Sequence, residues 1–173
     1  MLQAAIFVVF PFCMVFAAVS DMLSMTIANR VSVLLVVTFA VVAPLTGMEW
    51  STYGVHFAAG ALVLLVTFGL FAIGGMGGGD AKLLAATAVW MGLGMELVAY
   101  LVYASLLGGL LTVALIFYRN SWASALAGNN PFLRHFADRK AGIPYGIALG
   151  LSGLIVYPDT APVQWALNAA SAG

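Results

Sequence analysis

The order of apolar and polar residues divides the chain into long hydrophobic runs separated by short polar segments. A membrane-spanning helix needs about 20 mainly apolar residues, and somewhat fewer where neighbouring helices cover its ends. On this measure the pattern predicts an all-α, polytopic membrane protein that forms a single domain. The six predicted spans are residues 4–19, 31–45, 55–73, 81–93, 97–118 and 143–157. The remaining residues, 158–173, are predicted to form a short tail at the membrane interface.

Composition supports this class and excludes others. Of the 173 residues, 64% are hydrophobic and 7% are charged, and the mean hydropathy is +1.09, far above the range of water-soluble domains. Six basic and six acidic side chains give a formal net charge of zero, which argues against nucleic-acid binding. Cys13 is the only cysteine, so the chain has no intrachain disulfide and no thiolate metal cluster.

The first apolar run could also be a cleaved secretory signal, because small residues follow its apolar core. It lacks the basic residues with which such signals begin, and more membrane sequence follows it. We therefore predict a retained first helix.

The basic residues predict the orientation, because short cytoplasmic loops hold an excess of Lys and Arg. All six lie in the loops after the first, third and fifth spans: Arg30, Lys82, Arg119, Arg134, Arg139 and Lys140. Both termini are therefore expected on the extracytoplasmic side. In the last of these loops, residues 130–140 have the pattern of an amphipathic interfacial helix, although a simple charged stop between two spans fits equally well.

Two acidic residues on the predicted cytoplasmic side are candidates for chemistry. Asp21 and Asp80 each border a long apolar run, at a depth where a carboxylate begins to lose water and where ionisable groups are costly. Each also has a purely structural interpretation, since Asp80 could cap the helix that follows it and Asp21 could end the first span. Asp138, beside Arg139, is explained by a surface ion pair.

The segment before Asp80 is rich in glycine. Five of the six residues from Gly74 to Gly79 are glycines, which can adopt positive φ and allow another chain to approach closely. A helix cap alone does not require such a run. The glycines therefore favour a site that a second chain enters.

Several other chemistries fit poorly. A phosphate-binding loop requires Gly-Lys followed by Ser or Thr, whereas here an acid precedes Lys82. His56 is predicted on the opposite side of the membrane and His135 in the basic loop, and no nucleophile motif lies near either. Two aspartates alone would bind a metal ion weakly. If the first and fourth spans pack together, however, Asp21 and Asp80 can meet, share a proton and activate water as in aspartic proteases.

Three segments resemble a known family. Gly77-x-Gly79-Asp80 is the GxGD signature of membrane aspartic proteases, and the residues after it continue as in type IV prepilin peptidases. The segment SDMLSMTIANR, residues 20–30, resembles the first catalytic segment of that family. GIPYGIALG, residues 142–150, resembles its proline-containing motif near the last helix. The resemblance extends over most of the chain.

This resemblance implies an aspartic endopeptidase that cleaves prepilin leader peptides at the cytoplasmic face of the bacterial inner membrane. It implies that Asp21 and Asp80 are catalytic and that Gly77 and Gly79 shape the active-site loop. The supporting matches, whose roles it leaves open, are Asn29, Lys82, Pro144 and Gly146. The implied partners are a prepilin and membrane lipid, and no cofactor or metal is implied.

The chain departs from the larger, bifunctional members of that family. Their cytoplasmic domain, often with paired Cys-x-x-Cys motifs that bind zinc, is replaced here by about ten residues without cysteine. Methylation of the new pilin N-terminus is therefore not expected, and the compact form resembles the peptidases of Flp-type pili. Ala28 also stands where many relatives have proline.

Two functions of other classes remain as alternatives. Asp21 and Asp80 could relay protons in a small transporter or channel, because intramembrane carboxylates and glycine-broken helices are typical of such proteins. Both lie at one face, however, whereas a relay distributes such groups through the membrane. A non-catalytic scaffold does not explain a glycine-lined pair of acids.

Overall fold

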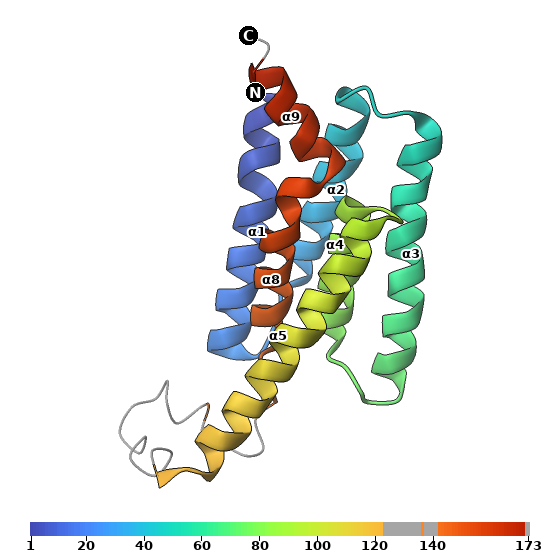
Figure 1. The fold of residues 1–173 in the computed structure, drawn as a ribbon. Coiled ribbons are helices and arrows are strands. Elements are labelled where there is room, and N and C mark those ends of the chain that lie inside the picture. Colours follow the sequence, from blue (N-terminus) through green and yellow to red (C-terminus); the bar gives the residue numbers. More distant parts are fainter. Residues whose placement is uncertain (123–135, 137–141, 172–173) are drawn as a thin grey trace.

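The computed structural model describes residues 1–122, 136 and 142–171, and all regular elements in these ranges are helices. The all-α prediction is therefore confirmed for the described residues. The helices, labelled as in Figure 1, are α1 (Leu2–Ser24), α2 (Asn29–Leu45), α3 (Trp50–Ala72), α4 (Gly78–Met91), α5 (Met95–Asn120), α8 (Tyr145–Val156), the 3-10 helix η2 (Tyr157–Asp159) and α9 (Ala161–Ser171). The predicted amphipathic helix within residues 130–140, with His135 and Asp138, lies outside the described residues except for Phe136.

The helices form an elongated bundle in which successive helices alternate in direction. In the view of Figure 1, α1, α3 and α5 run downward and α2, α4 and α8 run upward. Both ends of the chain consequently lie at the same end of the bundle. The predicted placement of both termini on one side agrees with this arrangement, while the side of the membrane that they occupy stays a prediction.

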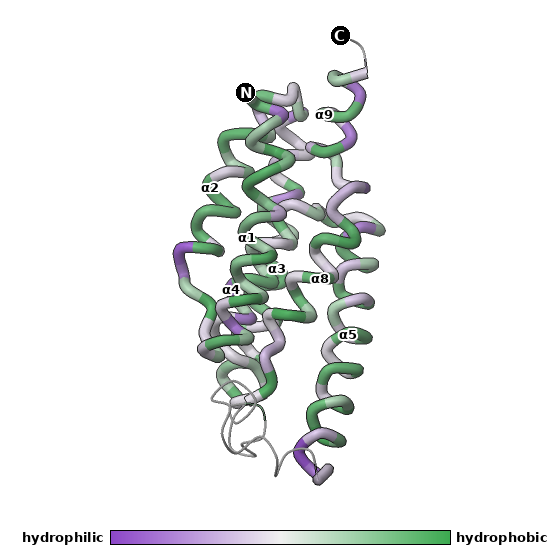
Figure 2. The backbone as a smooth tube through the Cα atoms, turned by 90° about the vertical axis from the view of Figure 1, so that its left-hand side faces the viewer, coloured by the Kyte–Doolittle hydropathy of each residue, from purple (hydrophilic) through white to green (hydrophobic). Residues whose placement is uncertain are grey.

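Three helices, α1, α3 and α5, are long and apolar enough to cross a membrane. A fourth candidate is α8 with η2 followed by α9, a pair bent by 47°, whereas α2 has 17 residues and α4 has 14. Hydrophobic residues cover most of the length of the helices, as Figure 2 shows. The described residues thus support three to four spans by length and composition, and the predicted total of six stays a prediction.

Two helix boundaries differ from the predicted ones and affect the site. Helix α1 continues past Val19 to Ser24, because Met22 and Leu23 extend its apolar sequence, and it ends where Met25 adopts a left-handed conformation with φ 52°. Helix α4 starts at Gly78, with Gly77 as its N-cap. Asp80 therefore lies inside the first turn of α4, and the alternative that Asp80 is the N-cap is wrong.

The core of the bundle is built around α4, whose residues from Leu83 to Met91 are all buried. Trp90 is fully buried, and its indole N–H donates a 3.0 Å hydrogen bond to the carbonyl of Leu35 in α2. Its ring packs edge-on against Phe10 and Phe39 at centroid distances of 5.2 and 5.5 Å. Helix α4 is thereby fixed against its neighbours.

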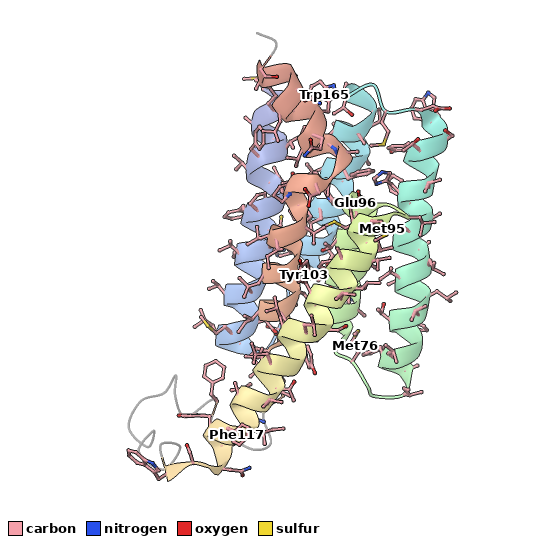
Figure 3. The ribbon with its side chains drawn as sticks, viewed as in Figure 1. Met76, Met95, Glu96, Tyr103, Phe117 and Trp165 are labelled. Carbon is pink, nitrogen blue, oxygen red and sulfur yellow. The ribbon has the colours of Figure 1, made fainter. Side chains whose placement is uncertain are left out.

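A histidine packs against the C-terminal end of α4. His56 of α3 is buried, and its Nδ1–H donates a 2.8 Å hydrogen bond to the carbonyl of Val89. Gly92 ends α4 with φ +72°, and a Cβ at this position would lie 2.9 Å from the His56 ring. The sequence places His56 in the third span, and the structure gives it this role in packing. Met95 and Glu96 begin α5 just after this turn, partway along the bundle (Figure 3).

Candidate active site

Asp21 lies in the last turn of α1 and is only 5% exposed. Its carboxylate Oδ2 accepts a 2.7 Å hydrogen bond from the backbone N–H of Gly146, the second residue of α8. Pro144, the N-cap of α8, is fully buried at the same point. The supporting residues Pro144 and Gly146 thus form the helix start that contacts Asp21.

Glycines bring α8 close enough to α1 for this contact. A Cβ at Gly146 would lie 2.7 Å from the Cβ of Asp21, and one at Gly150 would lie 2.7 Å from the carbonyl oxygen of Met14. Gly153, one turn further along, packs in the same way against the Met14 side chain. Small residues at this spacing allow close helix packing. The backbone of α8 therefore reaches the Asp21 carboxylate directly.

Asp80 approaches the same region from α4. Its carboxylate turns back over the N-cap, so that a Cβ at Gly77 would lie 2.7 Å from Asp80 Oδ2. Within the part of the chain that the structure describes, no hydrogen-bond donor and no basic side chain pairs with this carboxylate. It lies close enough to Asp21 for the two negative charges to repel each other. The fold thus brings together the two acids that the sequence singled out.

Helix ends favour negative charge at both positions. Asp80 occupies the first turn of α4, and Asp21 accepts a hydrogen bond at the N-terminus of α8. The N-terminus of a helix carries a partial positive charge and unpaired N–H groups, which stabilise a carboxylate. Both acids therefore receive favourable electrostatic contributions in an apolar surrounding.

Asn29 and Lys82 form a separate contact between α2 and α4. Lys82 Nζ donates a 2.9 Å hydrogen bond to Asn29 Oδ1, which links α4 to the first residue of α2. Nearby, the connection between α1 and α2 packs onto α4, because a Cβ at Gly79 would lie 3.2 Å from the Cβ of Ile27. These contacts join the two segments that carry the aspartates.

Most glycines in the run from Gly74 to Gly79 do not adopt the positive φ that glycine allows. Among residues 74–79, positive φ occurs at Gly74 alone, with φ +76°. The space beside the last three glycines is occupied by the chain itself. A Cβ at Gly77, Gly78 or Gly79 would contact Asp80, Phe71 or Ile27, respectively. Met76 lies in the loop that leads into α4 (Figure 3). That the glycines also leave room for an extended substrate stays a prediction.

Sequence reasoning missed the contact that fixes the start of α8 from its other side. The hydroxyls of Tyr145 and Thr112 share a 3.2 Å hydrogen bond, and Tyr145 packs against Gly108 of α5. Tyr145 immediately precedes Gly146, so this contact fixes the N–H that binds Asp21. No sequence motif marks a tyrosine for such a pairing.

Other types of site are not evident in the described parts of the chain. Among these residues, no three His, Cys, Asp or Glu side chains gather as they would around a metal ion. Cys13 is buried and unpaired in the core.

Comparison with known protein families finds a match for this chain. The family model described as "Type IV leader peptidase family" matches residues 8–114, a range that contains both Asp21 and Asp80. No curated protein and no solved structure matches the chain. Gly146 lies beyond the matched range, yet the fold places it against Asp21. The match covers more than half of the sequence, and the chain belongs to the type IV leader peptidase family.

Proposed function

We propose that the protein is an aspartic endopeptidase in which Asp21 and Asp80 form the catalytic pair. The observation that carries this proposal is the approach of two carboxylates, from α1 and α4, at one end of the bundle. Membership of a protease family supports the class of reaction. The proposal adds the identity of the catalytic groups.

In this mechanism the two acids share one proton. Close like charges cannot both ionise readily, so one carboxyl is protonated while the other is a carboxylate. The carboxylate removes a proton from a water molecule, whose oxygen attacks the scissile carbonyl carbon, while the protonated carboxyl donates to the carbonyl oxygen. The carboxyl that took the proton from water then donates it to the departing nitrogen, the other carboxylate takes a proton from a hydroxyl of the tetrahedral intermediate, and the C–N bond breaks. The N–H of Gly146 fixes the orientation of Asp21 throughout.

The proposed substrate is the leader peptide of a Flp-type prepilin, cut just before the apolar helix of the pilin. Cleavage at the cytoplasmic face of the inner membrane is supported by the basic residues, since Arg30 and Lys82 belong to the segments that carry the two acids. Six spans are supported by the alternating directions of six helices (Figure 1). The connection between α1 and α2 contains no cysteine, so we propose cleavage without methylation.

A processing assay tests this proposal. Asp21→Asn and Asp80→Asn, each co-expressed with a Flp-type prepilin, should leave the protein in the membrane and leave the prepilin at its full length. Asp159→Asn is the matched control, because Asp159 is exposed in η2 far along the chain from both acids, and it should process normally. Complete processing by either of the first two variants would falsify the proposal.

The alternative of a proton-coupled transporter is tested with the same variants. It predicts proton or solute flux in liposomes that depends on both aspartates. No contact among the described residues favours it, because the two acids meet at one end of the bundle.

A further inference from the structure

A groove of about 630 Å³ lies on the far side of α4 from the acids, between α2 and α3. Its walls are apolar over most of their length, with Val33 and Val37 on α2, Leu64 on α3 and Ala85 on α4. Val33, Val37 and Leu64 are exposed, so the groove opens to the outer surface of the bundle. In a membrane protein, this surface faces lipid.

The groove exists because α2 and α3 both pack mainly against α4 and contact each other chiefly around Phe39. Gly60 lets α3 approach α4 closely, since a side chain there would clash with Val89. The floor between them is made of the small side chains Ala85 and Ala86. The resulting space is part of the helix packing, and it does not require a side chain to move.

One end of the groove is polar and positively charged. Asn29 and Lys82 lie there, at the starts of α2 and α4, and a hydrogen bond joins them. Among the described residues no carboxylate pairs with Lys82. Ser32 also lines the groove, is 91% buried, and its hydroxyl has no hydrogen-bond partner in the described part of the chain. The start of α2 has no side-chain cap either.

We propose that this groove binds one anionic phospholipid, with its acyl chains along the apolar walls and its phosphate beside Lys82 and Asn29. The unneutralised cation, the free N–H groups of α2 and the unpartnered Ser32 hydroxyl all suit phosphate oxygens. The apolar walls suit hydrocarbon. The polar end and the apolar walls of the groove therefore follow one another as the headgroup and the acyl chains do in a phospholipid.

The position of the groove favours a lipid over the transmembrane helix of a substrate. Lys82 is two residues beyond Asp80, which is about 200° around a helix, so the groove and the acids lie on opposite faces of α4.

Native mass spectrometry of the purified full-length protein tests this site. The probes are phosphatidylglycerol and phosphatidylcholine with identical acyl chains. The wild type should retain one phosphatidylglycerol in preference to phosphatidylcholine. Lys82→Gln should reduce that preference about five-fold, as expected for one basic group near a headgroup, while Lys82→Arg should preserve it.

Filling the groove should remove the bound lipid. Ala61→Trp places a large ring in the groove, and Ala58→Trp is its control, because Ala58 is exposed on α3 outside the groove. Val37→Phe provides a second filling variant should Ala61→Trp fail to fold, as judged by its elution as a single species. Equal retention of the two lipids by the wild type would overturn the proposal. The proposal would also be overturned if a groove-filling variant kept its bound lipid but no longer crosslinked to a prepilin helix. That result would assign the groove to the substrate.

Discussion

Gly146 offers a sharp test of the site, because its backbone rather than a side chain contacts Asp21. Gly146→Ala would place a Cβ 2.7 Å from the Cβ of Asp21, 2.9 Å from its Oδ2 and 3.0 Å from its Cγ. Carbon atoms do not approach so closely, and Asp21 is buried in a regular helix. Turning the carboxyl would leave the Cβ of Asp21 in place, so α8 must withdraw from α1, and this movement breaks the 2.7 Å hydrogen bond.

The expected loss can be estimated from this one contact. A hydrogen bond to a charged group contributes about 1.5–3 kcal/mol. A loss of about 2 kcal/mol in the free energy of unfolding lowers the Tm of a protein of this size by roughly 4–8 °C. The effect on catalysis should be larger, because displacing a catalytic group by about 1 Å costs on the order of 100-fold in rate. Prepilin processing should thus fall about 100-fold while most of the protein remains folded.

The assay compares the initial rate of prepilin cleavage and the Tm of the purified variant with those of Gly109→Ala. Gly109 is also a helical glycine, but a Cβ there would meet nothing within 4 Å. This control should process normally and gain up to about 1 kcal/mol in stability from the higher helix propensity of alanine. If Gly146→Ala cleaves prepilin at the wild-type rate, the contact does not position Asp21 for catalysis.

Three further predictions follow from the same geometry. The cleavage rate should have a bell-shaped pH dependence. It should fall at low pH, where both acids are protonated, and at high pH, where both are ionised. A rate that stays constant at alkaline pH would contradict a shared proton. EDTA should leave cleavage unchanged, because the proposed chemistry needs only water and the two acids, and activity lost to EDTA and restored by a divalent ion would count against it. In thermal unfolding, Lys82→Met and Asn29→Ala should be coupled by about 0.5–1.5 kcal/mol in a double-mutant cycle, whereas strictly additive effects would show that their 2.9 Å hydrogen bond contributes nothing.

The sequence predicted the helical class and the acids because both depend on local signals. Long apolar runs mark the helices, and a carboxylate beside such a run is unusual enough to single out Asp21 and Asp80. The ends of the helices were less predictable. The predicted span ends at Val19, but α1 continues to Ser24, because Met22 and Leu23 extend its apolar sequence. Similarly, Gly78 and Gly79 are helical although glycine disfavours helices, and a side chain at either position would press closely on Phe71 or Ile27.

The partners of the acids could not be predicted, because they are backbone groups and distant residues. The donor to Asp21 is the main-chain N–H of Gly146, 125 positions away, and any residue other than proline has such a group. What distinguishes Gly146 is the absent side chain, and this becomes meaningful only once α8 is packed on α1. The pairing of Tyr145 with Thr112 depends in the same way on the packing of α8 against α5.

The short helix α4 has a consequence for the bilayer around the protein. Its 14 residues extend about 21 Å, whereas a hydrocarbon core is about 30 Å thick. The turn that follows α4 lies partway along the bundle, and there Met95 is 77% exposed beside the partly buried Glu96 (Figure 3). Next to this turn, the polar groups would lie about 9 Å inside the hydrocarbon core of the bilayer. Local thinning of the membrane relieves such a hydrophobic mismatch. Water would then reach Glu96 through a dimple in the leaflet on the side of the chain termini, opposite Asp21 and Asp80.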